Sequence, residues 1–393
     1  MNQGNVEMRD HGVRFNGIEN GRISLRVGVG LAAMGTALAT SASSASAQQT
    51  VPGSDPECPI VINEAVCEGD LGDGIVSRPG DPIFDLLIVR NATTDIDPPA
   101  GTAGIEVTRD TGDIEIDVED GIVINVDNTP DTQGFGIIAT TADGLIDIDS
   151  AADITGVGTN APSIGISAFT PAGTGSITVN NTGNIDVTSA NQRVIGILGQ
   201  NEVGGDISIT NAVGSSIMAR SNSTGERDEL LASIGAFSLN GDGNIRIENN
   251  GVLRIEATLD NFDTDVAGAA SAITINNFGG NNTTTIVTGA TSDISAIGTQ
   301  ANGVFAVASS TTGQSVIDID TDGAFSILGD NSYAILAQGN SGDVVLDVNN
   351  SATVTTGTGS GGAILLFASA ASNDLNVLNT GALNAGGTFD YAV

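Results

Sequence analysis

The sequence predicts an all-β protein, a parallel β-helix (solenoid) with three short strands per coil and about nine to ten coils. Three observations lead to this fold class. Apolar residues recur with a period of about 30 residues from residue 86 onward, they alternate with polar residues, and turn-forming residues separate the alternating segments. Glycine contributes 53 of 393 residues and tryptophan is absent, a composition that suits thin stacked layers better than a globular core.

The first strand of each repeat begins at an apolar anchor and has a second apolar residue two positions later. This alternation is typical of a strand with one buried face. Thr288, two residues after Ile286, is the exception to the second position. The anchors are Ile114, Ile146, Ile177, Ile207, Ile245, Ile286, Ile317, Leu346 and Leu375.

Two further strands follow in each repeat. The second is expected to open eight residues after the anchor, beyond turn residues such as Thr182-Gly183-Asn184. Its apolar residues are Ile122, Ile154, Ile185, Leu253, Ile294, Phe325, Val354 and Leu383, and Ile217 in the Ile207 repeat. The third strand shows a small residue and then an apolar one: Gly136-Ile137, Gly165-Ile166, Gly196-Ile197, Gly303-Val304, Ala334-Ile335 and Ala363-Ile364.

Asparagine recurs four residues after the anchor. If these positions point inward, each amide can bond to its copies above and below, as in stacked parallel sheets. The alternative is that asparagine is simply a good turn former at these positions. The five residues are Asn181, Asn211, Asn249, Asn350 and Asn379.

The first 47 residues are expected to be a signal peptide. An apolar run at 27–39 is too short to span a bilayer, and a small-residue stretch ends at Ala45-Ser46-Ala47. Cleavage is therefore expected between Ala47 and Gln48. A membrane anchor is the alternative, and the glycine- and alanine-rich run argues against it. The expected location is the cell surface or the extracellular space, or the periplasm if no translocator is present. Arginines precede the run, among them Arg14, Arg22 and Arg26.

Residues 48–85 show no repeat and are expected to form an N-terminal cap. Cys58 and Cys67 lie in this segment and should pair in an oxidising compartment; two free thiols are the alternative. The solenoid is expected to occupy 86–393. Its first coil is assigned from Ile88, Ile96 and Gly104-Ile105.

Charge excludes several functions. The chain has 12 basic residues, all arginine, against 47 acidic residues, and its net charge of −35 argues against nucleic-acid binding. Without lysine, and with His11 as the only histidine, the mature chain cannot carry a Ser-His-Asp triad or Ser-Lys catalysis. No catalytic or cofactor-binding residue is therefore assigned. Carboxylate- or metal-based chemistry on polysaccharides remains possible.

The best candidate for a metal site is weak. Asp318, Asp320 and Asp322 match the first half of a calcium-binding loop, but the acid required at its twelfth position is replaced by Gly329. Since Ile317 and Ile319 are core positions, the aspartates are more simply explained as a solvated strand face. Weak calcium binding is the most that this pattern predicts.

Two repeats carry insertions, at 221–230 and at 259–268. Loops that protrude from a solenoid often bind ligands, although tolerated length variation explains them equally well.

A signal peptide, a short lead and degenerate coils such as GSITVNNTGNIDVTSANQRVIGILGQ and VVLDVNNSATVTTGTGSGGAILLFASA resemble autotransporter (type V secretion) passenger regions. The resemblance covers residues 1–393 and implies surface display and adhesion to a host surface, matrix or glycan ligand. The chain departs from the family because it lacks a C-terminal translocator barrel, which is expected in a longer parent. The alternatives are a secreted polysaccharide-active β-helix enzyme and a surface-layer or matrix protein.

The repeat predicts that the chain ends within an unfinished coil. The third-strand residue lies 18 positions after the anchor in three repeats, and Leu375 plus 18 gives Val393, the last residue. We expect such a chain to be a fragment that self-associates through its uncapped C-terminal end.

Overall fold

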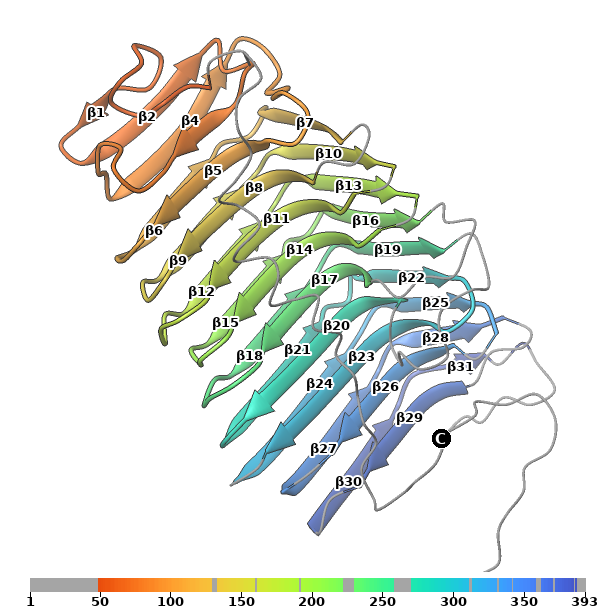
Figure 1. Ribbon diagram of the computed structural model, residues 1–393. Helices are drawn as coiled ribbons and strands as arrows, with labels where there is room; N and C mark the ends of the chain where they lie inside the picture. Colours follow the sequence, from red (N-terminus) through yellow and green to blue (C-terminus); the bar gives the residue numbers. More distant parts are fainter. Residues whose placement is uncertain are drawn as a thin grey trace, which may run out of the picture.

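The computed structural model describes residues 49–386, except for 129–132, 160, 191, 222–229, 258–269, 311–312, 331, 341, 358–361, 370–371 and 385. Every regular element in this part of the chain is a β-strand, and the strands form three sheets (Figure 1). The chain visits the three sheets in turn and makes about nine turns. The predicted fold class, a parallel β-solenoid with three strands per coil, is therefore confirmed.

Sheet 1 has twelve strands and contains the anchor of each repeat. In spatial order it consists of β1 (Ile60–Val61), β2 (Glu64–Gly69), β4 (Leu86–Ala92), β6 (Ile114–Val118), β9 (Ile146–Ser150), β12 (Ile177–Asn181), β15 (Ile207–Asn211), β18 (Ile245–Asn249), β21 (Asn282–Thr288), β24 (Gln314–Thr321), β27 (Asp343–Asn350) and β30 (Ser372–Asn379).

Sheet 2 has nine strands and is formed by the second strand of each repeat. Its members are β7 (Val123–Asn128), β10 (Asp153–Gly158), β13 (Asn184–Ser189), β16 (Ser216–Ser221), β19 (Val252–Ala257), β22 (Asp293–Ile297), β25 (Ala324–Leu328), β28 (Thr353–Thr356) and β31 (Leu383–Asn384).

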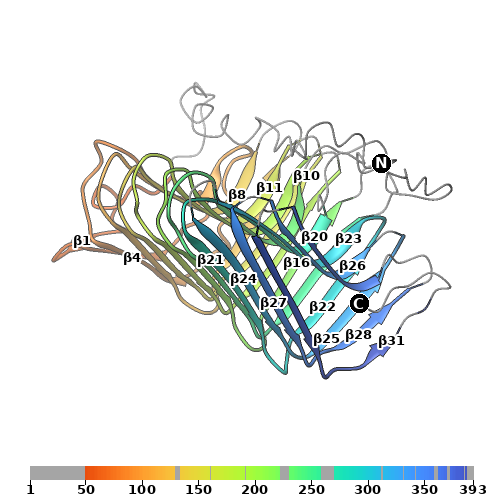
Figure 2. The ribbon, with the colours of Figure 1, turned by 90° about the horizontal axis from the view of Figure 1, so that it is seen from below.

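Sheet 3 has ten strands and is formed by the third strand of each repeat. Its members are β3 (Ile75–Ser77), β5 (Ala103–Arg109), β8 (Gly134–Thr141), β11 (Ser163–Thr170), β14 (Val194–Asn201), β17 (Leu231–Ser238), β20 (Ala270–Gly279), β23 (Ala301–Ser310), β26 (Tyr333–Gly339) and β29 (Gly362–Ala368). Figure 2 shows strands of the three sheets stacked along one direction.

The core lies between the three sheets and consists of columns of equivalent residues from successive coils. Ile146 pairs with Ile177, and Ile177 pairs with Ile207, so the predicted anchors stack in register. These side chains are fully buried because each coil covers the one before it at a spacing of about 4.8 Å. Repeated burial of isoleucine and valine is the main source of stability in such a stack.

The anchor predicted at Ile286 is wrong by two residues. Ile286 pairs with Ile247, whereas Thr284 pairs with the anchor Ile245. Thr284 is fully buried and accepts a hydrogen bond from the Asn277 side chain at 3.2 Å. A threonine at a core position cannot be recognised from hydrophobicity, which is why the sequence favoured the neighbouring isoleucine.

Two other positions were also misassigned. Ile88 is not inward-facing: the buried residues of β4 are Leu87 and Val89 on either side of it. In the next coil Ile124, and not Ile122, pairs with Ile154. In both places two nearby apolar residues compete, and only the pairing register distinguishes them.

The small residue that opens the third strand is required by close packing at a corner of the coil. A Cβ atom at Gly196 would lie 2.1 Å from Ile217 Cγ2 and 2.5 Å from the carbonyl oxygen of Ser233. The apolar residue that follows, Ile197, stacks between Ile166 and Ile234. The small-then-apolar signature therefore marks the place where sheet 3 turns over sheet 2.

The predicted asparagine ladder is present. Asn181 donates to Asn211 Oδ1 at 2.9 Å, and Asn211 donates to Asn249 Oδ1 at 2.8 Å. Asn350 donates to Asn379 Oδ1 at 2.6 Å in the last coils. Each ladder also supports the turn, because Asn181 and Asn350 donate to carbonyl oxygens two residues further on. Both explanations offered for these asparagines are therefore correct.

Parallel pairing begins earlier than the expected boundary at residue 86. β2 pairs in parallel with β4, and β3 pairs in parallel with β5. Ala65 and Cys67 of β2 are buried in the same columns as Leu87 and Val89. Because these side chains are small, the repeat cannot be recognised here from hydrophobicity. Only β1, which runs antiparallel to β2, departs from the parallel order at this end (Figure 1).

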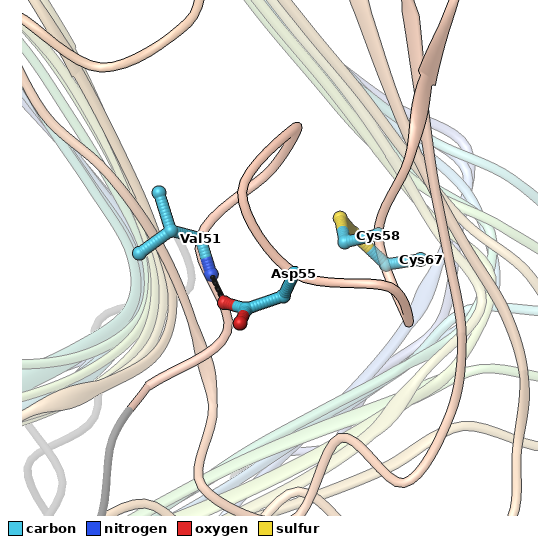
Figure 3. The surroundings of a disulfide bond; sticks show 4 residues. All are labelled: Val51, Asp55, Cys58 and Cys67. Atoms are coloured by element: carbon cyan, nitrogen blue, oxygen red, sulfur yellow. Dashed lines mark hydrogen bonds between the residues drawn. A yellow bond between two sulfur atoms is a disulfide. The ribbon is translucent and has the colours of Figure 1, made fainter.

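Cys58 and Cys67 form the expected disulfide, and both are fully buried (Figure 3). The loop before Cys58 is closed by a hydrogen bond of 2.5 Å from the backbone N–H of Val51 to Asp55 Oδ2. The disulfide thus ties this loop to β2.

Removing the disulfide should lower the stability of the N-terminal end. The Cys58→Ala/Cys67→Ala variant is expected to lose at most about 3 kcal/mol of unfolding free energy, because the bond closes a short loop. Urea unfolding with and without reductant measures the loss. Reductant should leave the double variant unchanged, and a wild-type protein insensitive to reductant would contradict a stabilising role.

Candidate functional surfaces

The outer face of sheet 1 carries stacked carboxylates. Glu115 of β6 pairs with Asp147 of β9, and Asp318 of β24 pairs with Asp347 of β27. This is the stacking expected from the repeat. Like charges one coil apart, at about 4.8 Å, repel one another and destabilise the fold.

The acidic columns perturb three carboxyl groups. Burial raises the pKa of Asp147, and the neighbouring Asp149 and Glu115 carboxylates raise it further. Burial is also the main cause of the raised pKa of Asp318, followed by repulsion from Asp320 and Asp347. The pKa of Asp117 is raised in the same way.

Other outer carboxylates are relieved by neutral donors one coil away. Asn180 donates to Asp149 Oδ1 at 2.7 Å, and Asn349 donates to Asp320 Oδ1 at 2.9 Å. Asp147 has no such donor: its Oδ1 atom is buried without a hydrogen-bond partner. Charge repulsion therefore lowers the stability of the fold most at carboxylates without a neutral donor, such as Asp147.

Stability should rise on acidification from neutral pH. A carboxyl whose folded-state pKa is raised binds protons more tightly in the folded state, so the folded state gains stability as pH falls through that pKa. The gain ends near the unfolded-state value of about 3.9. The lowered pKa of the exposed Asp70, caused first by the Thr94 hydrogen bond, opposes this change weakly.

Asp147→Asn is expected to raise stability at neutral pH by up to about 1 kcal/mol and to flatten the pH dependence. Melting temperatures between neutral and mildly acidic pH test this, and added salt should raise the wild-type value by screening. Asp206→Asn is the control, because Asp206 accepts hydrogen bonds from the backbone and side chain of Asn244. Equal stabilisation by both substitutions would contradict the assignment to Asp147.

The candidate calcium residues lie near one another but do not surround a cation. Asp318 and Asp320 project outward from β24, and Asp322 caps the following turn by accepting from the Gly323 N–H at 2.7 Å. Across the described ranges, no three His, Cys, Asp or Glu side chains are grouped so that they could hold a metal.

A surface hollow of about 170 Å³ lies beside these residues, between the last coils. The paired side chains of Asp320 and Asn349 line it, and the exposed Leu378 adds an apolar wall. These side chains offer hydrogen-bond acceptors and donors together with a small apolar contact. That combination suits a hydroxyl-rich ligand. The remaining lining residues are Thr288, Thr321, Asp322, Asn350, Ser351 and Thr380.

Part of the outer face of sheet 3 is apolar, unlike that of sheet 1. Ile138, Leu198 and Phe237 belong to a second hydrophobic cluster outside the main core, against which Leu230 and Leu239 pack. Further along this face Phe305, Leu336 and the partly exposed Leu365 stack in register, and polar residues such as Thr274 and Gln338 lie among the apolar ones. The sequence patterns did not predict this apolar row. Its signal is the near-continuous apolar run of strands such as VIGILGQN, typical of parallel strands buried on both faces.

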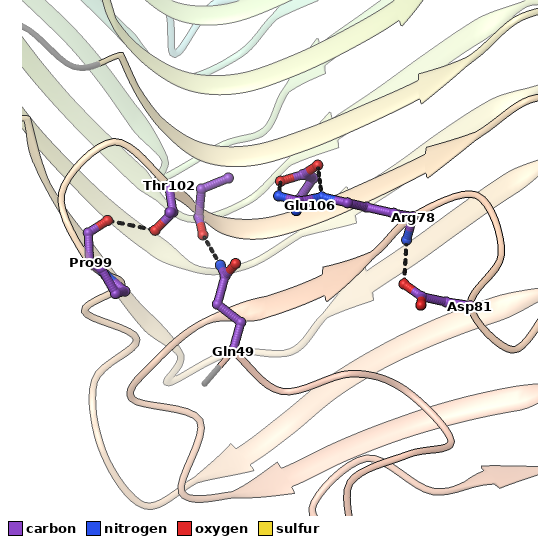
Figure 4. A network of polar contacts seen from close by, with 7 residues as sticks. Gln49, Arg78, Asp81, Pro99, Thr102 and Glu106 are labelled. Carbon is purple, nitrogen blue, oxygen red and sulfur yellow. Dashed lines mark hydrogen bonds and ion pairs between the residues drawn. The ribbon is translucent and has the colours of Figure 1, made fainter. Parts of the chain in front are cut away.

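At its N-terminal end, the outer face of sheet 3 carries an ion pair between the buried Glu106 and the exposed Arg78 (Figure 4). Glu106, in register with Ile138, accepts two hydrogen bonds of 2.8 Å from Arg78. These contacts raise the pKa of Arg78. Gln49 donates to the carbonyl oxygen of Ala103 at 3.4 Å, and Thr50 forms a parallel bridge with Ile75. The first described residues are thus held against sheet 3.

Several predicted features lie outside the described residues. These are the signal peptide with its cleavage site between Ala47 and Gln48, the insertion at 259–268, nearly all of the insertion at 221–230, and the end of the chain at Val393. The neighbouring strands show where the insertions attach. One lies between β16 and β17 and the other between β19 and β20, so each connects a strand of sheet 2 to a strand of sheet 3 along the chain.

The fold and its surfaces define the class of protein as a parallel β-solenoid. No helix in the described part of the chain is long and apolar enough to cross a bilayer. Comparison with protein-family models, with curated proteins and with solved structures gave no match.

Proposed function

We propose that this protein is a surface-displayed or secreted structural or adhesive β-solenoid of the autotransporter passenger type, without catalytic activity. The observation that carries the proposal is the continuous stack of about nine coils, which forms one elongated body. A long, regular stack offers an extended surface for contacts with other molecules.

The position of the first described residues supports export. Thr50 donates its N–H to the Gly74 carbonyl at 2.8 Å and accepts from the Val76 N–H at 3.0 Å. These residues, at the start of the described range, come directly after the cleavage site expected between Ala47 and Gln48. Removal of the leader would therefore leave this pairing intact.

Export is tested by producing the full chain in a Gram-negative host. We expect the exported protein to begin at Gln48 and to be accessible to protease on intact cells or in the medium. Protein that keeps its leader and stays in the cytoplasm would contradict the proposal.

Adhesion is tested by binding the exported protein to arrays of glycans and matrix proteins. The hollow lined by Asp320 and Asn349 favours a hydroxyl-rich glycan. Asp320→Ala is expected to weaken such binding roughly tenfold or more, since hydrogen bonds to a charged group contribute about 1.5–3 kcal/mol. Asp330→Ala, outside the hollow, is the control. If the two variants bind the ligand equally well, the hollow is not the binding site.

A further inference from the structure

The turn between β1 and β2 holds an isoleucine in a position that favours asparagine or glycine. Ile62 and Asn63 form this two-residue turn, and both have left-handed backbone conformations, with φ angles of 52° and 65°. A β-branched side chain is strained at positive φ, which is why such turns usually contain asparagine or glycine. Ile62 is also 92% exposed, so packing does not offset the strain. The side chain of Ile62 therefore lowers the stability of the fold, which indicates a role in contact with another molecule.

Ile62 belongs to an exposed apolar patch that also includes Val61 and Ile83. Val61 is 57% exposed and Ile83 is 80% exposed. The loop before β4 holds Ile83 beside the turn through two hydrogen bonds. The backbone N–H of Asp85 donates to the carbonyl oxygen of Asn63 at 2.7 Å, and Asn63 Nδ2 donates to Asp85 Oδ2 at 3.2 Å. Two separate segments thus contribute to one apolar surface.

This apolar patch lies on a firmly held support. The Cys58–Cys67 disulfide joins the residues on either side of the β1–β2 turn. A Cβ atom at Gly53 would lie 2.8 Å from Ile60 Cδ1 and 3.2 Å from Pro82 Cβ, so the loop before Cys58 packs against both β1 and the loop before β4. A surface that is already held in place loses little conformational entropy when a partner docks on it.

Acidic side chains surround the apolar patch. Glu64, which pairs with Val61 across the hairpin, and Asp85 are both exposed. Residues 48–85 contain eight acidic residues but only one basic residue, Arg78, and this arginine is paired with Glu106. An apolar centre with a polar rim is typical of a protein–protein contact. Because the rim is negative here, the complementary surface has to be cationic.

We propose that the apolar patch of Val61, Ile62 and Ile83 binds a cationic amphipathic segment of another protein. Apolar side chains of that segment cover the patch, and its lysine or arginine side chains pair with Glu64 and Asp85. The inference adds a protein partner to the adhesive function proposed above and rests on it. It uses a surface distinct from the hollow between the last coils.

The probe is a labelled synthetic peptide of alternating leucine and lysine, titrated with the purified chain whose disulfide is intact. Fluorescence anisotropy should show saturable binding that salt weakens. Ile62→Asn is expected to raise the dissociation constant roughly tenfold or more. Its melting temperature should equal or exceed that of the wild type, because asparagine tolerates the left-handed conformation. Val213→Asn is the matched control and should bind normally, since Val213 is 68% exposed but has no acidic residue within five positions along the sequence.

Two comparison probes separate this contact from others. A lysine–serine peptide of the same length tests charge alone, and phosphatidylcholine vesicles test binding to lipid. The proposal is overturned if the leucine–lysine peptide does not bind, if the lysine–serine peptide binds equally well, or if the chain binds the vesicles in place of the peptide. A folded Ile62→Asn variant that binds like wild type, or a Val213→Asn variant that does not, also overturns it. Glycan binding by Ile62→Asn should be unchanged, so failure of this contact is distinguishable from failure of the proposed function.

Discussion

Replacing Asn211 with alanine is expected to lower the free energy of unfolding by about 3–5 kcal/mol. Asn211 is fully buried, accepts hydrogen bonds from Asn181 Nδ2 at 2.9 Å and Ser215 Oγ at 2.7 Å, and donates to Asn249 Oδ1 at 2.8 Å. Alanine removes all three bonds and leaves buried groups on two neighbouring coils without this partner. The penalty for unsatisfied buried groups exceeds the gain from one ordinary hydrogen bond.

Urea unfolding followed by circular dichroism measures the loss, and hydrogen exchange locates it. Because a solenoid coil contacts mainly its neighbours, faster exchange should be confined to β12, β15 and β18 and should not reach β4. The control is Asn180→Ala one coil earlier, since Asn180 bonds to Asp149 on the exposed face. Its effect should stay within about 0.5 kcal/mol. Similar losses for the two variants would show that the ladder has no special role.

Replacing Gly196 with valine should destabilise the protein by about 3 kcal/mol or more. Even a single Cβ atom at this position would lie 2.1 Å from Ile217 Cγ2 and 2.5 Å from the Ser233 carbonyl oxygen. One contact is with a buried core side chain and the other is with backbone of the next coil, so neither can move without disturbing the stack. A β-branched side chain adds further atoms to the same space.

Ala334→Gly is the matched control, because Ala334 occupies the same position of the third strand in a later coil. Removing its Cβ atom should cost only about 0.5–1 kcal/mol, through backbone entropy. Thermal unfolding of the two variants gives the comparison. Near-equal melting temperatures would contradict the close packing of sheet 3 over sheet 2 at Gly196.

Repetition explains why so much of the fold could be predicted. Each position of a buried column has the same surroundings in every coil. The same residue type therefore recurs once per coil, as at Ile146, Ile177 and Ile207, and each recurrence makes the pattern easier to recognise. Asn181 and Asn211 were recognisable for the same reason. A globular core, by contrast, places each residue in a different environment and offers no repeated pattern.

Two of the errors occurred where a buried position does not hold a large apolar residue. Thr284 occupies an anchor position and Cys67 occupies a core column, but neither stands out by hydrophobicity. Ile88 has the opposite property, since it is apolar and yet faces outward. At such places register is set by backbone pairing across coils, to which every residue contributes whatever its side chain.

The sequence by itself determined the period, the three strands of each coil, the inward asparagines and the excess of acid, because each is a local property repeated along the chain. Only the tertiary structure decided which surfaces result. It placed Asp147 beside Glu115 without a neutral donor and brought Asp320 and Asn349 to one hollow. These surfaces depend on residues about 30 positions apart that meet only after stacking fixes the register, so their charge and exposure are properties of neighbouring coils together.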